Sequence, residues 1–212
     1  MERKIYLEKK YAFLLAIIYA VGIAGHLYDK TLQFMLLLTP FTLLVGALLI
    51  IYNEIKENRA KRVWFIISFV LTFLVEMVGV KTKYIFGDYT YGNVLGTKLF
   101  EVPLIIGINW VLIVLGSISI ASRIFNNKVW IVLASGLISM LFDFILEPVA
   151  IKLGYWSWMN NSIPLQNYIA WFLIASIISS LFVVLKLNVE KSLAEKYLHI
   201  QIVFFLILNC FL

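Results

Sequence analysis

Long apolar runs alternate with short polar segments along the whole chain. The runs are about 16–22 residues long, close to the length that a helix needs to cross the hydrocarbon core of a bilayer. Seven runs are expected to form membrane helices, at about 11–27, 32–52, 63–80, 102–122, 129–150, 167–187 and 197–212. The segments between them are too short for a soluble domain. The sequence therefore predicts an all-α, polytopic transmembrane helix bundle that forms a single domain over 1–212.

The composition agrees with this prediction, since 62% of the 212 residues are hydrophobic and only 14% are charged. Soluble domains usually carry about 25% charged residues. The first run follows four basic residues within the first ten positions, as the apolar part of a signal peptide would. The apolar run continues past the passable cleavage site at 20–22. An uncleaved first helix is therefore expected, with a signal peptide as the alternative.

The basic residues indicate how the helices are oriented. Of the 18 Lys and Arg residues, 13 fall in the N-terminal tail and every second linker, and 5 fall in the others. Positive segments usually remain cytoplasmic, so we expect a multi-pass protein of the cell inner (cytoplasmic) membrane, with the N-terminus cytoplasmic and the C-terminus extracytoplasmic. The net charge of +6 then orients the chain, and no nucleic acid partner is expected. The single cysteine, Cys210, excludes an internal disulfide and a cysteine-based metal cluster.

Three features recur in the same order in two parts of the chain. They are a Glu-to-Lys hexapeptide that ends a helix, an aromatic–hydroxyl–aromatic triplet, and a tryptophan seven residues after a proline. The first set lies at 76–81, 89–91 and 103–110, and the second at 147–152, 156–158 and 164–171. This pattern predicts a tandem parallel repeat, with units at about 63–122 and 129–187 (helices 3–4 and 5–6). Binding sites tend to lie between such units.

Polar residues within the predicted helices gather towards one side of the membrane. The loops at about 81–101 and 151–166 are separated by two helices and therefore share one side, which the charge pattern makes extracytoplasmic. Near these loops lie Glu76, Asn109, Asp143, Glu147 and Asn167. Membrane carboxylates usually face the bundle interior or water and mark function. We expect a pocket lined by these residues, whereas the opposite halves of the helices are mostly aliphatic.

Structural roles are the alternative for each of these residues. Glu147 can reach water at the interface, and Glu76 and Asp143 can hydrogen-bond a neighbouring helix. The amides can hold helices together, and the loop aromatics can form an interfacial belt. A structural role is also expected for His26, the lone histidine on this side.

Two signatures stand out in these segments. The first is Glu76-x-x-Gly79-Val80-Lys81-Thr82, Phe86-Gly87-x-Tyr89-x-Tyr91, Leu95-Gly96, Val102-Pro103 and Asn109-Trp110. The second is Asp143, Glu147-Pro148-Val149-Ala150, Gly154-x-Trp156-x-Trp158, Pro164-x-x-Asn167-Tyr168 and Trp171. Together they resemble the integral membrane carotenoid biosynthesis proteins, which include bacterioruberin-pathway and γ-carotene 1,2-hydratases. The family usually has aspartate where this chain has Glu147, and one methylene moves the carboxylate by about 1 Å.

The resemblance implies a carotenoid biosynthesis enzyme embedded with its substrate in the lipid bilayer. Hydration of a terminal C=C requires protonation to a tertiary carbocation and capture by water, and it needs no metal or cofactor. Glu76 and Asp143 are the expected acid/base pair, and Glu147 is the next catalytic candidate. Substrate-binding candidates are the amides and the aromatic residues, which can stabilise a cation: Asn109, Trp110, Trp156, Trp158, Asn167, Trp171, Tyr89 and Tyr91. Other pathway enzymes are candidate partners.

Two alternatives remain open. A lycopene-cyclase-like isomerase would use the same protonation, but an intramolecular alkene would capture the cation instead of water. A small-solute or proton carrier would use the carboxylates as a relay. A carrier requires polar groups through the full depth of the membrane, and the sequence places them mainly on one side.

Overall fold

The protein folds into seven α-helices joined by short connections, in a computed structural model that describes residues 2–56, 58–159, 161–188 and 192–212. The helices are α1 (Glu2–His26), α2 (Asp29–Ile50), α3 (Arg59–Thr82), α4 (Leu104–Ile124), α5 (Lys128–Lys152), α6 (Leu165–Val184) and α7 (Leu193–Phe211). A short π-helix, η1 (Ile51–Ile55), extends α2. The all-α prediction is confirmed.

Six of these helices are long and apolar enough to cross a membrane, namely α2 with η1, and α3 to α7. The chain is therefore a multi-pass membrane protein. The first expected span, which lies in α1, is not among these six helices. Helix α1 includes the charged N-terminal segment, which leaves it a shorter apolar part. Helix α7 begins four residues before the expected position, at Leu193 rather than at 197. Its start is fixed by Ser192, whose side chain accepts a hydrogen bond from the backbone N–H of Glu195.

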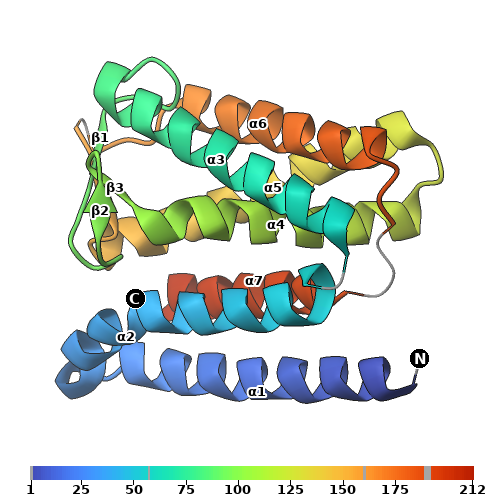
Figure 1. The fold of residues 1–212 in the computed structure, drawn as a ribbon. Helices are drawn as coiled ribbons and strands as arrows, with labels where there is room; N and C mark the ends of the chain where they lie inside the picture. Colours follow the sequence, from blue (N-terminus) through green and yellow to red (C-terminus); the bar gives the residue numbers. More distant parts are fainter. Residues whose placement is uncertain (1, 57, 160, 189–191) are drawn as a thin grey trace.

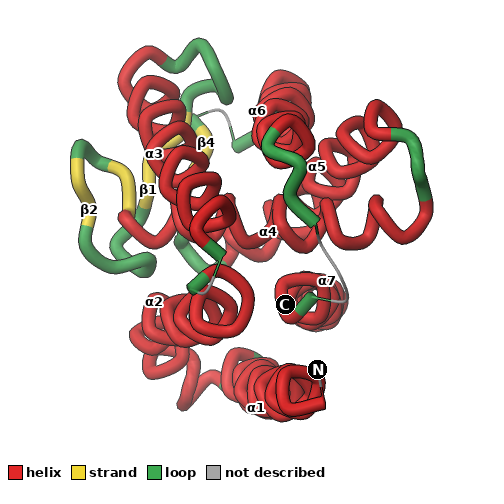
Figure 2. Tube along the Cα trace, turned by 45° about the vertical axis from the view of Figure 1, so that its right-hand side comes forward, coloured by secondary structure: helices red, strands yellow, loops and turns green. Residues whose placement is uncertain are grey.

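Helix α4 lies at the centre of the bundle. It contacts α3, α5 and α6 on one side and α2 and α7 on the other, and α1 packs outside α2 and α7. Figure 2 views α1, α6 and α7 nearly along their axes. Within its apolar stretch, 78% of the residues of α4 are buried. Ser117 and Ser119 of α4 are therefore shielded by neighbouring helices rather than exposed to lipid.

The two loops that carry the repeated aromatic triplets pair with each other at one end of the bundle (Figure 1). Strand β1 (Tyr89–Tyr91) runs antiparallel to β4 (Trp156–Trp158), with Thr90 opposite Ser157. A second small ladder joins β2 (Lys98–Leu99) to β3 (Val102–Pro103). The prediction that the two loops share one end and pack together is confirmed. Strands of two or three residues are too short for an alternating pattern to reveal them.

The close approach of these loops depends on Gly92. Its N–H donates to the carbonyl oxygen of Tyr155 at 2.8 Å. A Cβ atom on Gly92 would lie 2.0 Å from the carbonyl oxygen of Gly154, so any larger residue would separate the two loops. Gly92 therefore holds the β1–β4 pair in place above the ends of α3 and α5.

A second group of charged residues surrounds the buried Glu195 at the opposite end of the bundle. Glu195 of α7 accepts a hydrogen bond from Ser119 of α4 at 2.7 Å and forms an ion pair with Arg123. Glu54 of η1 accepts a hydrogen bond from the backbone N–H of Ala194 at 2.8 Å. The expectation that these helix halves are mostly aliphatic was therefore incomplete. Because α7 begins before its expected position, Glu195 lies inside the bundle rather than in a linker.

Candidate functional site

All eleven residues singled out from the sequence line one small pocket of about 40 Å³ beneath the β1–β4 pair. They come from α3, α4, α5, α6 and the two strands: Glu76, Tyr89, Tyr91, Asn109, Trp110, Asp143, Glu147, Trp156, Trp158, Asn167 and Trp171. Three further residues complete the lining, Phe86, Ile106 and Leu146. These three are apolar. Phe86 belongs to the first sequence signature but was not expected to line the site, and nothing in the sequence distinguished Ile106 and Leu146 from ordinary core residues.

Glu76 is the best-anchored carboxyl group of the pocket. It lies near the end of α3, is 4% exposed, and receives three hydrogen bonds from side chains. Tyr89 and Tyr91 donate their hydroxyls to Oε2 at 2.5 and 2.8 Å, and Trp110 donates Nε1–H to Oε1 at 2.7 Å. Both carboxyl oxygens are therefore engaged, and Glu76 joins the first aromatic triplet to α4.

The phenols that contact Glu76 remain protonated. Burial raises the pKa of Tyr89 and of Tyr91 well above the ordinary value of 10.0, and the negative charge of Glu76 raises both further. A neutral phenol can donate its O–H hydrogen to a carboxylate. The two tyrosines therefore act as hydrogen-bond donors throughout the physiological pH range.

Glu147 occupies the corresponding place at the end of α5. The indole N–H groups of Trp156 and Trp158 both donate to its Oε2, each at 2.9 Å. The side-chain amide of Asn167 donates to Oε1 at 3.3 Å. The second aromatic triplet thus contacts Glu147 as the first contacts Glu76. The difference is in the donors, which are two indoles here and two phenols there.

Asp143 is the least engaged of the three carboxyl groups. It lies one turn before Glu147 on the same face of α5 and is 1% exposed. The amide of Asn167 donates to its Oδ2 at 2.7 Å, and the described part of the chain provides no other hydrogen bond to it. Asn167 therefore bridges Asp143 and Glu147.

The carboxyl groups are surrounded by paired aromatic rings. Trp110 and Trp171 stack with ring centroids 3.4 Å apart and ring planes 14° from parallel. Tyr89 faces Trp158 with centroids 5.1 Å apart, and Tyr91 faces Trp156 at 5.9 Å. These side chains are packed inside the protein, so they do more than line the membrane interface. Among the described residues, no three His, Cys, Asp or Glu side chains are grouped in a metal-binding arrangement.

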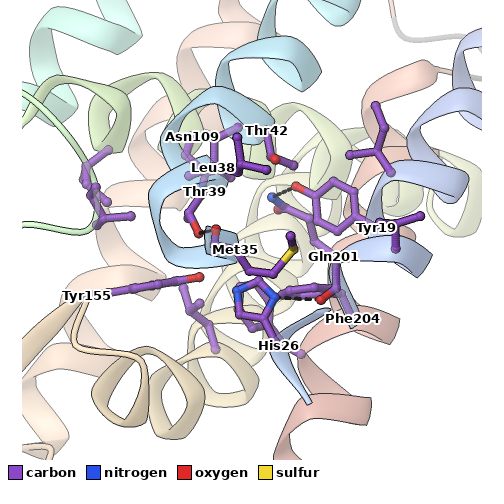
Figure 3. Close-up of a pocket in the computed structure, with 18 of the residues that line it drawn as sticks. Tyr19, His26, Met35, Leu38, Thr39, Thr42, Asn109, Tyr155, Gln201 and Phe204 are labelled. Carbon is purple, nitrogen blue, oxygen red and sulfur yellow. Dashed lines mark hydrogen bonds between the residues drawn. The ribbon is translucent and has the colours of Figure 1, made fainter. Parts of the chain in front are cut away.

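A larger cavity of about 280 Å³ adjoins this pocket. Its mostly apolar walls come from α1, α2, α4, α5, α7 and the β4 segment (Figure 3). Four residues line both spaces: Ile106, Asn109, Leu146 and Trp156. Asn109 thus stands between them, and its Oδ1 is buried without a hydrogen-bond partner in the described chain.

The sequence did not reveal most of this cavity, because its walls come largely from α1, α2 and α7, which lie outside the two predicted repeat units. His26, expected to be structural, lines it together with Tyr19 and Gln201. Gln201 was the available signal. It is an uncharged polar residue within the apolar part of the last helix and is only 1% exposed.

Comparison with known proteins agrees with the resemblance noted in the sequence. Residues 33–212 match the family described as "Carotenoid biosynthesis protein". A bisanhydrobacterioruberin hydratase of Haloarcula japonica is 32% identical over 116 residues, which are 51% of this chain and 40% of that protein. The aligned part thus spans less than half of the relative's length. No solved structure matches the chain. The chain belongs to the carotenoid biosynthesis protein family.

Proposed function

We propose that the protein adds water across the terminal C=C of an acyclic carotenoid end group. The observation that carries this proposal is the placement of a small carboxyl-lined pocket beside a larger apolar cavity, with four lining residues in common. A site of this size and polarity can hold water, and the adjoining cavity suits a hydrocarbon end group. The hydratase activity named for the Haloarcula japonica relative supports the same chemistry.

In this proposal Asp143 is the general acid. A carboxyl group is more easily kept protonated when fewer donors stabilise its charged form, and Asp143 receives one hydrogen bond, whereas Glu76 and Glu147 each receive three. Its proton is transferred to the terminal alkene carbon that carries one hydrogen. The neighbouring carbon, which carries two methyl groups, becomes a tertiary carbocation.

Glu76 is the proposed base. Water held in the pocket attacks the carbocation, the new C–O bond forms, and the proton released from that water passes to the Glu76 carboxylate. Return of a proton to Asp143 through pocket water restores the starting state, so the net reaction is addition of one water. Glu147, next to Asp143, keeps Asn167 and the two indoles in place and is the alternative base.

Aromatic faces stabilise the carbocation in this scheme. A cation over an aromatic ring gains about 0.5–2 kcal/mol. The stacked Trp110 and Trp171 line the small pocket, and Trp156 lines both the pocket and the larger cavity. Asn109, with its unpaired carbonyl oxygen, is placed to orient the attacking water.

The tandem parallel repeat remains part of the proposal. Its support is that residues at matching positions of the two predicted units contact one another. Trp110 stacks on its equivalent Trp171, and Thr90 lies opposite its equivalent Ser157. A two-fold axis through both pairs would relate α3–α4 to α5–α6. We also propose that the β1–β4 end is extracytoplasmic, with a cytoplasmic N-terminus, in the cell inner membrane.

A carrier would need a polar path from this pocket to the Glu195 cluster at the opposite end. Buried side chains between them include Ser117 and Ser139, whose hydroxyls donate to backbone carbonyls one turn earlier. The two hydroxyls also lie 3.0 Å apart, between α5 and α4. Neither serine carries a charge, and both hydroxyls already bond within the bundle, which favours an enzyme over a relay of carboxylates.

Expression in a lycopene-producing bacterium, with pigment masses as the readout, tests the proposed function. A gain of one or two waters per carotenoid is expected from the wild-type chain and not from Asp143→Asn at the same protein level. A new product with the mass of lycopene would instead identify a cyclase-like isomerase. Unchanged pigment, in cells whose membranes contain the folded protein, would contradict both hydration and cyclisation.

A further inference from the structure

The larger cavity contains polar atoms that its hydrocarbon walls leave unpaired. Three lining atoms are buried and form no hydrogen bond within the described chain: His26 Nε2, Asn109 Oδ1 and Gln201 Oε1. His26 is 6% exposed and Gln201 only 1%. Buried polar atoms of native proteins are nearly always paired, either with the protein or with a bound molecule. The cavity therefore points to a ligand that pairs with them.

All three unpaired atoms are hydrogen-bond acceptors. His26 Nδ1 lies 2.7 Å from the carbonyl oxygen of Gly22, so it must carry the ring hydrogen, and Nε2 of the neutral ring keeps a lone pair. The amide nitrogen of Gln201 donates to the hydroxyls of Tyr19 and Tyr197 at 3.0 and 2.9 Å. In this arrangement the amide oxygen has no partner among the described residues. The complementary ligand group is a donor.

The surroundings of these acceptors restrict the ligand further. Figure 3 shows His26, Gln201, Met35 and Tyr155 around one space, with the unbonded ring nitrogen of His26 on the side of Met35 and Tyr155. Most of the other lining side chains are hydrocarbon, including Leu38 and Phe204. A water molecule would need two to four polar partners. An apolar chain that carries a hydroxyl fits both the walls and the acceptors.

We infer that this cavity binds a hydroxylated isoprenoid end group, whose hydroxyl donates to His26 Nε2 or Gln201 Oε1. The inference rests on the proposed function and identifies His26 and Gln201 as specificity-determining residues. The volume of about 280 Å³ lies near the lower end of the usual range for ligand pockets, so an end group fits and the remainder of a long chain leaves towards lipid. Addition of water to a terminal alkene yields such a hydroxylated end, beside the shared wall residue Asn109.

Binding of two carotenoids to the full chain in lipid nanodiscs at pH 8, where imidazole is neutral, tests this inference. The probes are lycopene and its 1-hydroxy derivative, and quenching of tryptophan fluorescence reports binding, since Trp156 lines the cavity. One hydrogen bond to a buried acceptor predicts about 5–10-fold tighter binding of the hydroxy derivative. His26→Phe and Gln201→Met keep the side-chain volume but remove an acceptor. Each should reduce the preference, with lycopene affinity within about two-fold of wild type.

His199→Phe is the matched control. His199 also bonds through Nδ1 to a carbonyl four residues earlier, that of Glu195 at 2.8 Å, but it does not line the cavity. It should retain the full preference. If Gln201→Met does not fold, His26→Phe alone decides the question.

Equal binding of the two carotenoids to the wild type, or a preference unchanged by both substitutions, overturns the inference. Failure of the proposed function looks different. If the chain never hydrates lycopene but prefers the hydroxy derivative in a His26-dependent way, the binding site is supported and the hydratase proposal is contradicted. If the chain hydrates lycopene but binds both carotenoids equally, the hydratase proposal is supported and the binding site is contradicted.

Discussion

At the scale of single residues, the candidate site is built on two glutamates that lie near the ends of α3 and α5 and accept hydrogen bonds from the loops that follow. Glu76 binds the tyrosine triplet, and Glu147 binds the tryptophan triplet. Asp143 lacks such a set of donors, and this difference is the reason for proposing it as the proton donor. The three carboxyl groups, although buried together, should respond differently to replacement by amides.

Asp143→Asn should reduce turnover by about 10²-fold or more, the usual scale for loss of a general acid or base. Asparagine retains the shape and can still hydrogen-bond Asn167, so the amount of protein in the membrane should remain normal. The measurement is initial rate per amount of purified protein. Glu101→Gln, at an exposed loop residue outside the pocket, is the control and should be nearly silent.

Glu76→Gln should destabilise the protein more than Asp143→Asn does. Three donors converge on Glu76, and a glutamine has only one acceptor oxygen, so at least one buried donor loses its partner. An unsatisfied buried donor costs about 1–3 kcal/mol. Thermal unfolding in detergent, followed by tryptophan fluorescence, would show the order of the two variants. Equal Tm values would mean that the donors of Glu76 find other partners.

At the scale of elements, the helices were predictable because their apolar runs are long, whereas the contacts between loops were not. The six spans and the grouping of Glu76, Asp143 and Asn167 follow from hydrophobic length and depth along a helix. The β1–β4 pair does not, since strands of three residues have too few positions to show a period. The early start of α7 depends on one cap, Ser192. The cavity beside α1 and α7 depends on packing between segments more than 170 residues apart, as the 3.1 Å contact between Tyr19 and Tyr197 illustrates.

Gly92→Ala should separate the two loops and abolish activity. The added methyl group would lie 2.0 Å from a backbone oxygen, and a backbone atom cannot move aside as a flexible side chain can. Gly154→Ala is the comparison. Gly154 has a positive φ of 70°, but no atom lies within 4 Å of its added Cβ, so only conformational strain of about 1–2 kcal/mol is expected. Near-ultraviolet circular dichroism of the tryptophans and turnover should change much more for Gly92→Ala.

At the scale of the whole molecule, the proposed orientation places the paired loops on the extracytoplasmic side and the Glu195 end on the cytoplasmic side. Reporter fusions within 81–101 and 151–166 should behave as extracytoplasmic, and a fusion within 56–61 as cytoplasmic, because the basic residues of that linker favour retention. The opposite pattern would reverse the orientation but leave both loops on one side, as their pairing requires.

The central claim is that carboxyl groups of this chain transfer a proton to a carotenoid alkene and that water captures the cation. The most direct measurement is the mass of the product formed from lycopene by the purified protein in nanodiscs, in water enriched in ¹⁸O. The account predicts a hydroxylated carotenoid that carries the ¹⁸O label, with formation strongly reduced in Asp143→Asn. A product of unchanged mass, or a hydroxyl oxygen without the label, would contradict it.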